Sequence, residues 1–437
     1  MANKLPLNWC ECKFGDICYL QNGYAFNSKE YSDSGINLIR ISDIKDDKVI
    51  TDNCVKVCDN VDISFRVNKG DFLLAMSGAT TGKTGVYLYD NYALLNQRVG
   101  NLKIYSEDVL HPMYRNYFIM NKRREIEKKA YGGAQPNISK QLIEDLDLLL
   151  PPIAEQKRIV DKIEEIFAKI DAGVEKLKSA QEKIKQYKQS ILHSAFTGKL
   201  YKTTEWKELP LKDVCSINPK TEIPELKEED IVAFLPMPAV DAETNKYNEV
   251  YASFKSVKKG FTKFQNKDVL FAKITPCMEN GKSCVVDNLL HNIGFGSTEF
   301  HVLRCSENLL NKFIYFIISS VSFRKLAKMK MTGAVGQQRV PADFLKTFPI
   351  SLPTFSEQEK IIEEIEKRFT KTDKMLDAVE KSLETAEKLK QSILKKAFEG
   401  KLVPQDPNDE PASVLLARIK SEKQQNEKAK GKRNDRK

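Results

Sequence analysis

The sequence predicts an α+β fold: two mostly-β globular domains with added helices, separated by two long helices that pair as an antiparallel coiled coil, in a pseudo-two-fold internal duplication. Two observations carry this prediction. The stretch from Leu150 to Leu200 recurs without a gap from Leu352 to Leu402. The only two tryptophans, Trp9 and Trp206, begin the same Trp-x-Glu pattern ahead of each copy. One unit, a globular domain followed by a long helix, is therefore present twice.

Each copy of the repeated stretch carries the signals of one long helix. A Leu-Pro entry is followed by Glu-Gln, and Gly198 and Gly400 stand just past the last apolar residues, where a helix stops. About forty residues at roughly 1.5 Å each give a helix on the order of 60 Å long. Its single apolar stripe must be buried against a partner, and the duplicate is the nearest candidate. The alternative of two unrelated surface helices leaves the gapless repeat unexplained.

A two-fold-like relation between the halves would make the two helices antiparallel. The apolar residues recur with the three-and-four alternation of a coiled-coil seam. The expected seam consists of Ile163, Phe167, Ile170, Val174, Leu177, Ile184 and Ile191, and of Ile365, Phe369, Leu376, Val379, Leu383 and Ile393.

Short β-like runs dominate the first globular segment, and turn formers separate them. We expect strands at Asn37–Ile41, Phe72–Ala75, Gly85–Tyr89 and Val99–Ile104. A helix follows at Pro112–Lys129, and then a glycine-rich link. The second globular segment repeats this order with little identity, including one helix at Asn311–Lys330. Similar helices on divergent domains indicate a shared scaffold whose domains recognise different things.

These patterns predict five segments: a globular domain at 1–149, a helical region at 150–200, a second globular domain at 201–351, a second helical region at 352–402, and a C-terminal region at 403–437. The last begins with a proline-broken linker. Ser413 is expected to cap a short amphipathic helix. A basic, disordered tail is expected after it.

Composition narrows the class of protein. Charged residues make up 30% and hydrophobic residues 41%, and the longest apolar run, Phe313–Ile318, is far shorter than a membrane span. No apolar segment follows Asn3-Lys4, so no signal peptide is expected. Nine scattered cysteines favour reduced thiols and a cytoplasmic location. The net charge of +10, concentrated in the tail, permits nucleic acid binding without requiring it.

Metal and catalytic motifs are weak. Cys10-x-Cys12 and Cys54-x3-Cys58 could be half of a metal site, but the four histidines are scattered and there is no second CxxC, which disfavours zinc. The segment Gly78–Thr84 resembles a phosphate-binding loop but has three residues between its glycines where that motif needs four. It is better interpreted as a hairpin whose Lys83 can reach a DNA phosphate. With no methyltransferase signature, nucleophile elbow or zinc helix, we expect no catalytic residue and no metal.

Polar side chains on the loops of the globular segments are the remaining candidates. Arginine and lysine can bind the N7 and O6 atoms of guanine, and asparagine and glutamine can bind adenine. The DNA-binding candidates in the first half are Asn22, Tyr24, Arg40, Ser77, Lys83, Asn96, Gln97, Arg98 and Gln135. Those in the second half are Lys273, Thr275, Lys282, Ser297, Thr298, Gln337, Gln338 and Arg339.

Taken together, the duplication, the Leu-Pro-x-x-x-Glu-Gln entries and the Ala-Phe-x-Gly-Lys-Leu exits resemble the DNA specificity (S) subunit of a type I restriction–modification system, over essentially the full length. The C-terminal Val403–Pro407 with Pro411–Ser413 is similar to the end of that family. The link at Gly333–Ala334 with Gln337–Pro341, and the hairpin at Ile274–Pro276 with Glu279–Lys282, resemble its target recognition domains.

The resemblance implies a non-catalytic, cytoplasmic subunit of a methyltransferase and endonuclease complex. Residues 1–149 and 201–351 would each read one half of a bipartite, asymmetric DNA target. Residues 150–200 and 352–402 would be the central and C-terminal conserved regions that set the spacer. The implied partners are double-stranded DNA, two modification (methyltransferase) subunits and two restriction (helicase–nuclease) subunits. S-adenosylmethionine, ATP and Mg would bind those partners, none would bind this chain, and no membrane is involved.

Three alternatives stay open on the sequence. The first is the specificity subunit of a related bipartite-site system that cuts beside its target. The second is a structural coiled-coil adaptor that does not read DNA. The third is a nucleotide-dependent enzyme built on the loop at Gly78.

Overall fold

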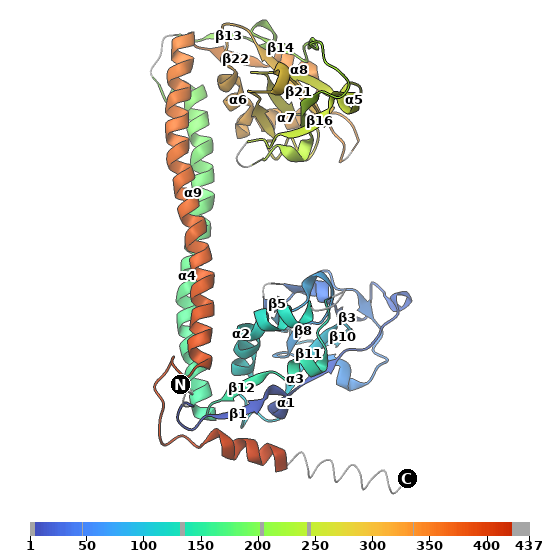
Figure 1. Cartoon of the computed structure of the whole chain (residues 1–437), viewed down its shortest axis with the longest axis vertical. Coiled ribbons are helices and arrows are strands. Elements are labelled where there is room, and N and C mark those ends of the chain that lie inside the picture. Colours follow the sequence, from blue (N-terminus) through green and yellow to red (C-terminus); the bar gives the residue numbers. More distant parts are fainter. Residues whose placement is uncertain are drawn as a thin grey trace. The chain divides into compact units, whose positions relative to one another are not determined.

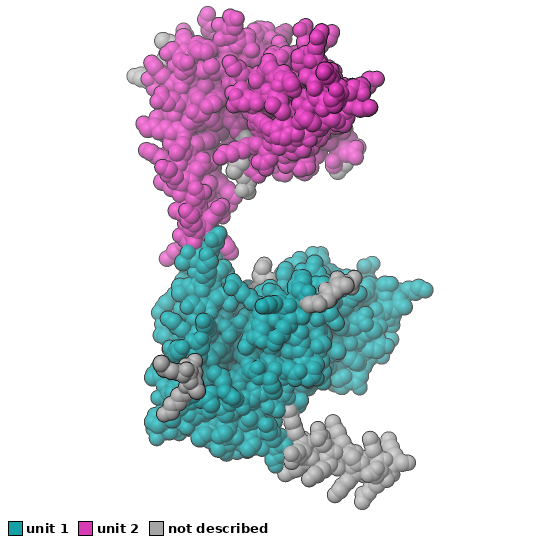
Figure 2. Space-filling model, viewed as in Figure 1, with its two compact units in different colours: residues 1–175, 383–437 teal, residues 176–382 magenta. Residues whose placement is uncertain are grey.

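The computed structural model describes residues 5–45, 47–131, 136–201, 205–242, 246–334 and 336–421. The chain forms two compact units (Figure 2). Unit 1 comprises Met1–Glu175 and Leu383–Lys437, and unit 2 comprises Lys176–Ser382. Two long helices, α4 (Ile153–Phe196) and α9 (Phe355–Phe398), each contribute one part to unit 1 and the other part to unit 2 (Figure 1).

Unit 1 contains a six-stranded sheet in the order β2-β11-β8-β9-β5-β4, a four-stranded sheet in the order β6-β3-β10-β7, and the pair β1-β12. The strands are β1 (Cys10–Lys13), β2 (Cys18–Asn22), β3 (Ile36–Ile39), β4 (Ile44–Lys45), β5 (Asp47–Val49), β6 (Lys56–Val57), β7 (Arg66–Val67), β8 (Phe72–Ala75), β9 (Thr84–Val86), β10 (Ala93–Leu95), β11 (Val99–Ile104) and β12 (Asp147–Leu150). The helices are α1 (Phe14–Ile17), α2 (Pro112–Ala130) and α3 (Lys140–Glu144). The strands β8 and β11 have the bounds that the sequence predicts.

Unit 2 contains two four-stranded sheets, in the orders β14-β21-β18-β19 and β16-β15-β20-β17, and the pair β13-β22. The strands are β13 (Lys207–Pro210), β14 (Cys215–Ile217), β15 (Ile231–Leu235), β16 (Val250–Ser253), β17 (Thr262–Gln265), β18 (Val269–Ala272), β19 (Ser283–Val285), β20 (Ile293–Gly296), β21 (Phe300–Cys305) and β22 (Pro349–Leu352). The helices are α5 (Phe254–Val257), α6 (Asn311–Ser319), α7 (Val321–Met329) and α8 (Ala342–Thr347).

The expectation of one helix over Asn311–Lys330 is wrong, because α6 and α7 are separate. The break falls at Ser320, which has extended backbone and whose side-chain oxygen accepts a hydrogen bond from Phe323 N. A serine hydroxyl that satisfies a free N–H starts a new helix in place of continuing the old one.

The two units share one topological plan. Both contain a corresponding parallel pair: Leu94 of β10 lies beside Leu38 of β3, and Gly294 of β20 lies beside Ala233 of β15. Unit 1 has a second parallel pair, in which Asp47 of β5 lies beside Gly85 of β9. The β8–β9 hairpin of unit 1 corresponds to the β18–β19 hairpin of unit 2. The duplication predicted from the helices therefore extends to the globular parts, where the sequences have diverged.

The two long helices pair in both units. In unit 1 the first part of α4 packs with the last part of α9, and Ile163 and Ile393 belong to one buried cluster. In unit 2 the last part of α4 packs with the first part of α9, and Ile191 and Ile365 share a cluster. The helices therefore run antiparallel, as predicted. Every expected seam residue is buried or half-buried on its helix.

A repeated glutamine attaches each globular part to its helices. The Gln156 side chain accepts a hydrogen bond from His111 N at 2.8 Å and donates one to Val109 O at 2.8 Å. The Gln358 side chain accepts from Leu310 N at 2.9 Å and donates to Asn308 O at 2.9 Å. Both glutamines have no exposed surface. The Glu-Gln entry of each helical repeat thus fixes the loop that leads into α2 or α6.

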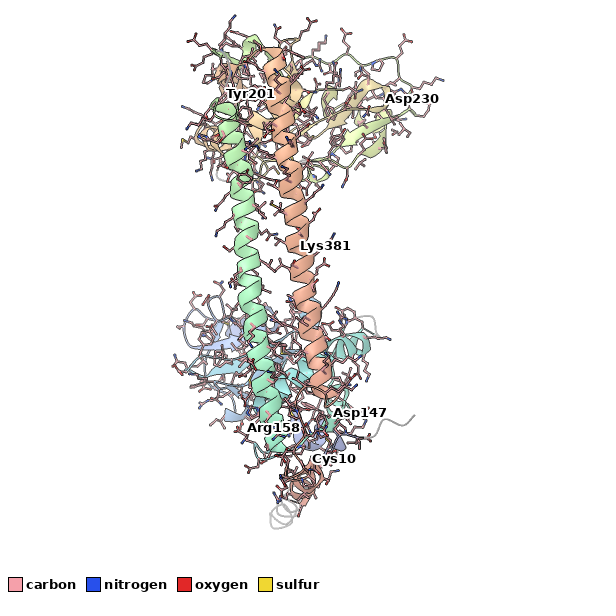
Figure 3. All side chains as sticks on the ribbon, turned by 90° about the vertical axis from the view of Figure 1, so that its left-hand side faces the viewer. Cys10, Asp147, Arg158, Tyr201, Asp230 and Lys381 are labelled. Carbon is pink, nitrogen blue, oxygen red and sulfur yellow. The ribbon has the colours of Figure 1, made fainter. Side chains whose placement is uncertain are left out.

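The two ends of the described chain meet in unit 1. Arg158 of α4, labelled in Figure 3, forms an ion pair with Asp409 at 2.6 Å. Residues 412–421 are helical, and Ala412 N donates to Asn8 O at 3.0 Å. The predicted cap at Ser413 is wrong, because the helix already begins at Ala412, directly after Pro411. The basic tail after residue 421 lies outside the described residues. Among the described residues, no helix is both long and apolar enough to cross a membrane.

Candidate nucleic-acid interface

In unit 1, the turn between β10 and β11 brings three predicted residues together. Asn96 N donates to Ile39 O at 3.2 Å, and the Asn96 side-chain oxygen accepts from Arg98 N at 3.3 Å. Gln97 N donates to Tyr24 O at 2.9 Å. The backbone of this turn is fixed at both ends, while the side chains of Gln97 and Arg98 are exposed.

A second set of hydrogen bonds joins this turn to the end of β8. Met76 N donates to Arg98 O at 2.9 Å, and Ile138 N donates to Met76 O at 2.8 Å. Ser77, Arg98 and Asn137 consequently line one cavity of about 830 Å³, together with Gly78, Ala79, Tyr131 and Pro136. The predicted residue Gln135 lies outside the described residues.

The other predicted residues of unit 1 surround the same strand ends. Tyr24 is exposed, and its ring packs edge-on against Phe26 and Phe65. Asn22 is exposed at the end of β2, and Lys83 is half-buried in the β8–β9 hairpin. Arg40 directs its Nε at the Asp43 carboxylate, 3.5 Å away. Arg40 therefore already has an acidic partner.

The main-chain hydrogen bonds that join Ile39 to Asn96, Arg98 to Met76 and Met76 to Ile138 form what we call the backbone frame of unit 1. Unit 2 repeats this frame with different side chains. Ser297 N donates to Leu235 O at 3.1 Å, and the Ser297 hydroxyl accepts from Glu299 N at 3.2 Å. Lys273 N donates to Glu299 O at 2.9 Å, and Val340 N donates to Lys273 O at 2.9 Å. Ser297, Thr298 and Glu299 therefore occupy the positions that Asn96, Gln97 and Arg98 occupy in unit 1, and Arg339 occupies the position of Asn137.

An ion pair marks this frame in unit 2. Arg339 Nη2 lies 2.7 Å from Glu299 Oε1, and Arg339 Nε lies 2.9 Å from Glu299 Oε2. The hydrogen bonds from Arg339 hold the pKa of the Glu299 carboxyl below its ordinary value. The same contact raises the pKa of Arg339. Both groups therefore stay charged at neutral pH.

Neighbouring predicted residues hold the extended segment that carries Arg339. Thr275 N donates to Gln338 O at 3.0 Å, and Gln338 N donates to the Thr275 hydroxyl at 3.2 Å. Arg339 N donates to Thr332 O at 2.8 Å. Gln337 and Thr298 are exposed. Lys282 differs, because its ammonium donates to Met237 O at 3.0 Å.

Two members of the frame, Asn137 and Glu299, are absent from the sequence prediction. An acidic residue is an unexpected neighbour for phosphate, so Glu299 gave no signal on its own. The comparison of the two units does single out Glu299. When the β20–β21 turn is aligned with the β10–β11 turn, Glu299 falls at the position that corresponds to Arg98.

The remaining motifs are the loop at Gly78 and the close cysteines. The loop at Gly78 joins β8 to β9, which are antiparallel with Leu74 beside Thr84, so a strand follows it where a phosphate-binding loop needs a helix. Across the part of the chain that the structure describes, no cluster of three or more His, Cys, Asp or Glu side chains could hold a metal ion. Burial raises the pKa of Cys12 to about 12, which keeps that thiol protonated.

The geometry defines a class of protein: two domains of one topology, mounted on paired antiparallel helices, that present different side chains in the same backbone frame. Residues 6–182 and 203–385 match the family described as the type I restriction modification DNA specificity domain. The chain belongs to this family.

Comparison with individual relatives agrees with this assignment. The chain is 36% identical over 263 residues to the specificity subunit of the type I restriction enzyme EcoAI from Escherichia coli, a match that covers 50% of this chain and 44% of that relative. It therefore aligns with less than half of that protein. It is 24% identical over 461 residues to the EcoKI specificity subunit of Escherichia coli strain K12, covering 97% of each chain.

A solved structure has the same fold. A chain from a study of the assembly and conformational transition of the type I R-M system superposes with a TM-score of 0.68 at 17% identity. The superposition covers 91% of this chain and 99% of that chain. At 17% sequence identity, this similarity shows a shared fold only.

Proposed function

We propose that this chain is the DNA-recognition subunit of a type I restriction–modification complex, and that each of its two globular domains reads one half of a bipartite, asymmetric target. One observation carries the proposal: a shared backbone frame presents Arg98 and Asn137 in unit 1 but Glu299 and Arg339 in unit 2. Two half-sites of different base sequence can be read by two domains that share the same backbone frame and carry different side chains on it.

The symmetry of duplex DNA and the hydrogen-bonding groups on its base edges support this assignment. Its sugar–phosphate backbone has local two-fold symmetry, so a duplicated protein can meet two half-sites with equivalent domains. Base edges in the major groove accept hydrogen bonds from arginine, asparagine and glutamine, the side-chain types gathered at the two frames. The paired helices are the part of the chain suited to fixing the unread spacer, since a helix rises about 1.5 Å per residue.

The chemistry belongs to other subunits in this proposal. Two modification subunits would methylate adenine with S-adenosylmethionine, and two restriction subunits would use ATP and Mg for translocation and cleavage. This chain would bind none of these cofactors and would be non-catalytic. Its place would be the cytoplasm.

The test is a domain exchange in the assembled complex. The full chain is co-expressed with its modification subunit, and methylated adenines are mapped across the host genome. We expect one bipartite motif, and replacement of residues 1–149 by the corresponding domain of another family member is expected to change one half-site only. Changes in both half-sites, or no bipartite motif with the parent chain, would show that the proposal is wrong.

A further inference from the structure

The Arg339 side chain is held in one orientation by four hydrogen bonds. Its Nε donates to both carboxylate oxygens of Glu299, at 3.2 and 2.9 Å, and its Nη2 donates to Oε1 at 2.7 Å. Its Nη1 donates to Gln337 O at 3.0 Å. The backbone of Arg339 is fixed as well, by paired hydrogen bonds with Thr332 of 2.8 and 2.9 Å. An arginine normally loses considerable side-chain entropy when it binds, and here much of that loss has already occurred.

These contacts leave a specific pair of donors. A guanidinium has five N–H groups. The Glu299 carboxylate takes the Nε–H and one N–H of Nη2, and Gln337 takes one N–H of Nη1. Among the described residues, one N–H of Nη1 and one N–H of Nη2 remain for a ligand. Two donors on adjacent nitrogens match the O6 and N7 acceptors of guanine in the major groove, the commonest specific contact that arginine makes.

The exposure of the pair separates it from a structural ion pair. The Arg339 side chain is 43% exposed, with Glu299 at 24%. In the same unit, Arg304 also binds a carboxylate through two hydrogen bonds, but its partner Asp268 is 1% exposed. The Arg304 pair is part of the interior of the domain, whereas the Arg339 pair faces solvent at the frame on which the predicted DNA-binding residues converge.

The corresponding position in unit 1 has the opposite pattern. Arg98 replaces Glu299, and Asn137 replaces Arg339, on backbone that makes the same hydrogen bonds. Asparagine presents a donor and an acceptor, which suits adenine and not guanine. The frame is therefore a place where the two domains differ in hydrogen-bonding character while their backbones agree.

We infer that Arg339, oriented by Glu299, is the specificity-determining residue that reads a guanine in the half-site of unit 2. Glu299 acts as a positioning residue. Its carboxylate holds the Arg339 guanidinium in place, and the guanidinium, not the carboxylate, contacts the base. This inference rests on the proposed function, because it requires that unit 2 reads DNA.

The experiment uses the full chain in complex with its modification subunit and maps methylated adenines genome-wide. Three variants are compared with the parent: Arg339→Lys, Arg339→Gln and Glu299→Ala. Lysine keeps the charge but lacks the planar fork. We expect Arg339→Lys to lose discrimination at one G·C pair of one half-site, by roughly 5- to 150-fold in relative methylation. Arg339→Gln is expected to favour adenine at that position.

The positioning role has its own readout. Glu299→Ala is expected to relax the same base pair to a smaller degree and to leave every other position of the motif unchanged. Arg368→Ala is the matched control, because Arg368 is 38% exposed and pairs with Glu364 on α9, outside the frame. The control is expected to keep the parental motif. Thermal unfolding of each variant identifies any that fails to fold.

The outcomes distinguish the inference from the proposed function. A bipartite motif for the parent chain, combined with an unchanged motif in Arg339→Lys, overturns the inference and leaves the proposed function standing. A uniform loss of methylation without any change of motif identifies a phosphate contact and also overturns it. Absence of a bipartite motif with the parent chain removes the proposed function itself.

Discussion

The Lys390 ammonium of α9 lies over the ring of Phe167 of α4, 5.1 Å from the ring centroid, and also binds Asp171. In unit 2 the same three residue types recur: Lys188 lies 5.1 Å from the Phe369 centroid and binds Asp373. The repeated sequence thus produces a repeated contact between the helices. Each contact combines a cation–π interaction with a half-exposed ion pair.

Removing either lysine should loosen the helix pair locally. Lys390→Ala is expected to destabilise unit 1 by about 1 kcal/mol, the sum of an exposed cation–π contact and a surface ion pair. Hydrogen–deuterium exchange of α4 and α9 measures the effect, which should be confined to unit 1, whereas Lys188→Ala should act in unit 2. Lys388→Ala is the control, since Lys388 is 76% exposed. An equal effect of the control would refute the role of the aromatic contact.

The repeated glutamines should contribute more. Gln156→Ala leaves the backbone groups of His111 and Val109 without their partners in a buried site, which costs about 2 kcal/mol. Gln358→Ala should cost a similar amount in unit 2. Thermal unfolding and limited proteolysis near residue 110 are the measurements. Gln186→Ala, at an exposed position of α4, should change stability by less than about 0.5 kcal/mol.

Glu155 should produce a pH-dependent effect. It is buried and accepts a hydrogen bond from Trp9 Nε1 at 2.9 Å, and burial raises the pKa of its carboxyl above the ordinary 4.5. A raised carboxyl pKa means that the folded state loses stability as pH rises from the unfolded pKa to the folded pKa, and the loss persists above it. Glu155→Gln removes that cost and keeps an acceptor for Trp9.

Glu155→Gln should therefore be at least as stable as the parent at pH 7. Its advantage should shrink as pH falls from the raised folded-state pKa of Glu155 towards the unfolded pKa of about 4.5, and should be lost below that pH. The stability difference between variant and parent, measured by thermal unfolding across this pH range, isolates Glu155 from other titrating groups. A variant that is less stable than the parent at pH 7 would contradict the burial argument.

Matched insertions in the helices test their role as a spacer ruler. Asp171 pairs with Lys390 and Lys188 with Asp373, so a heptad inserted after Ala180 is matched by one after Glu380. Seven residues add about 10 Å of helix, or about three base pairs of DNA. Methylation mapping should show a longer spacer between unchanged half-sites. Insertions of four residues, which break the heptad seam, are the control and should impair the complex.

The fold was most predictable where the internal repeat is strongest. The α4 and α9 helices were predictable because an apolar stripe recurs twice without a gap, and only the extreme ends differ, since Leu150 belongs to β12. The break at Ser320 was missed because a single serine cap is a weak signal inside an apolar helical pattern. The choice of Arg98 and Arg339 followed from side-chain chemistry alone.

The frame itself could not be predicted. It depends on backbone hydrogen bonds between segments far apart in the chain, such as Ile138 to Met76 and Val340 to Lys273. Backbone bonds leave little trace in side-chain identity, and the two domains have diverged around them. The partnership of Glu299 with Arg339, across a long stretch of sequence, therefore emerges only in three dimensions.

Because the backbone of each frame is held by main-chain bonds, its outward side chains can be exchanged without refolding the domain. A few codon changes at these positions could therefore change the DNA sequence that the protein recognises. Under the proposed function, the partner subunits would then act at the new DNA sequence without any change of their own.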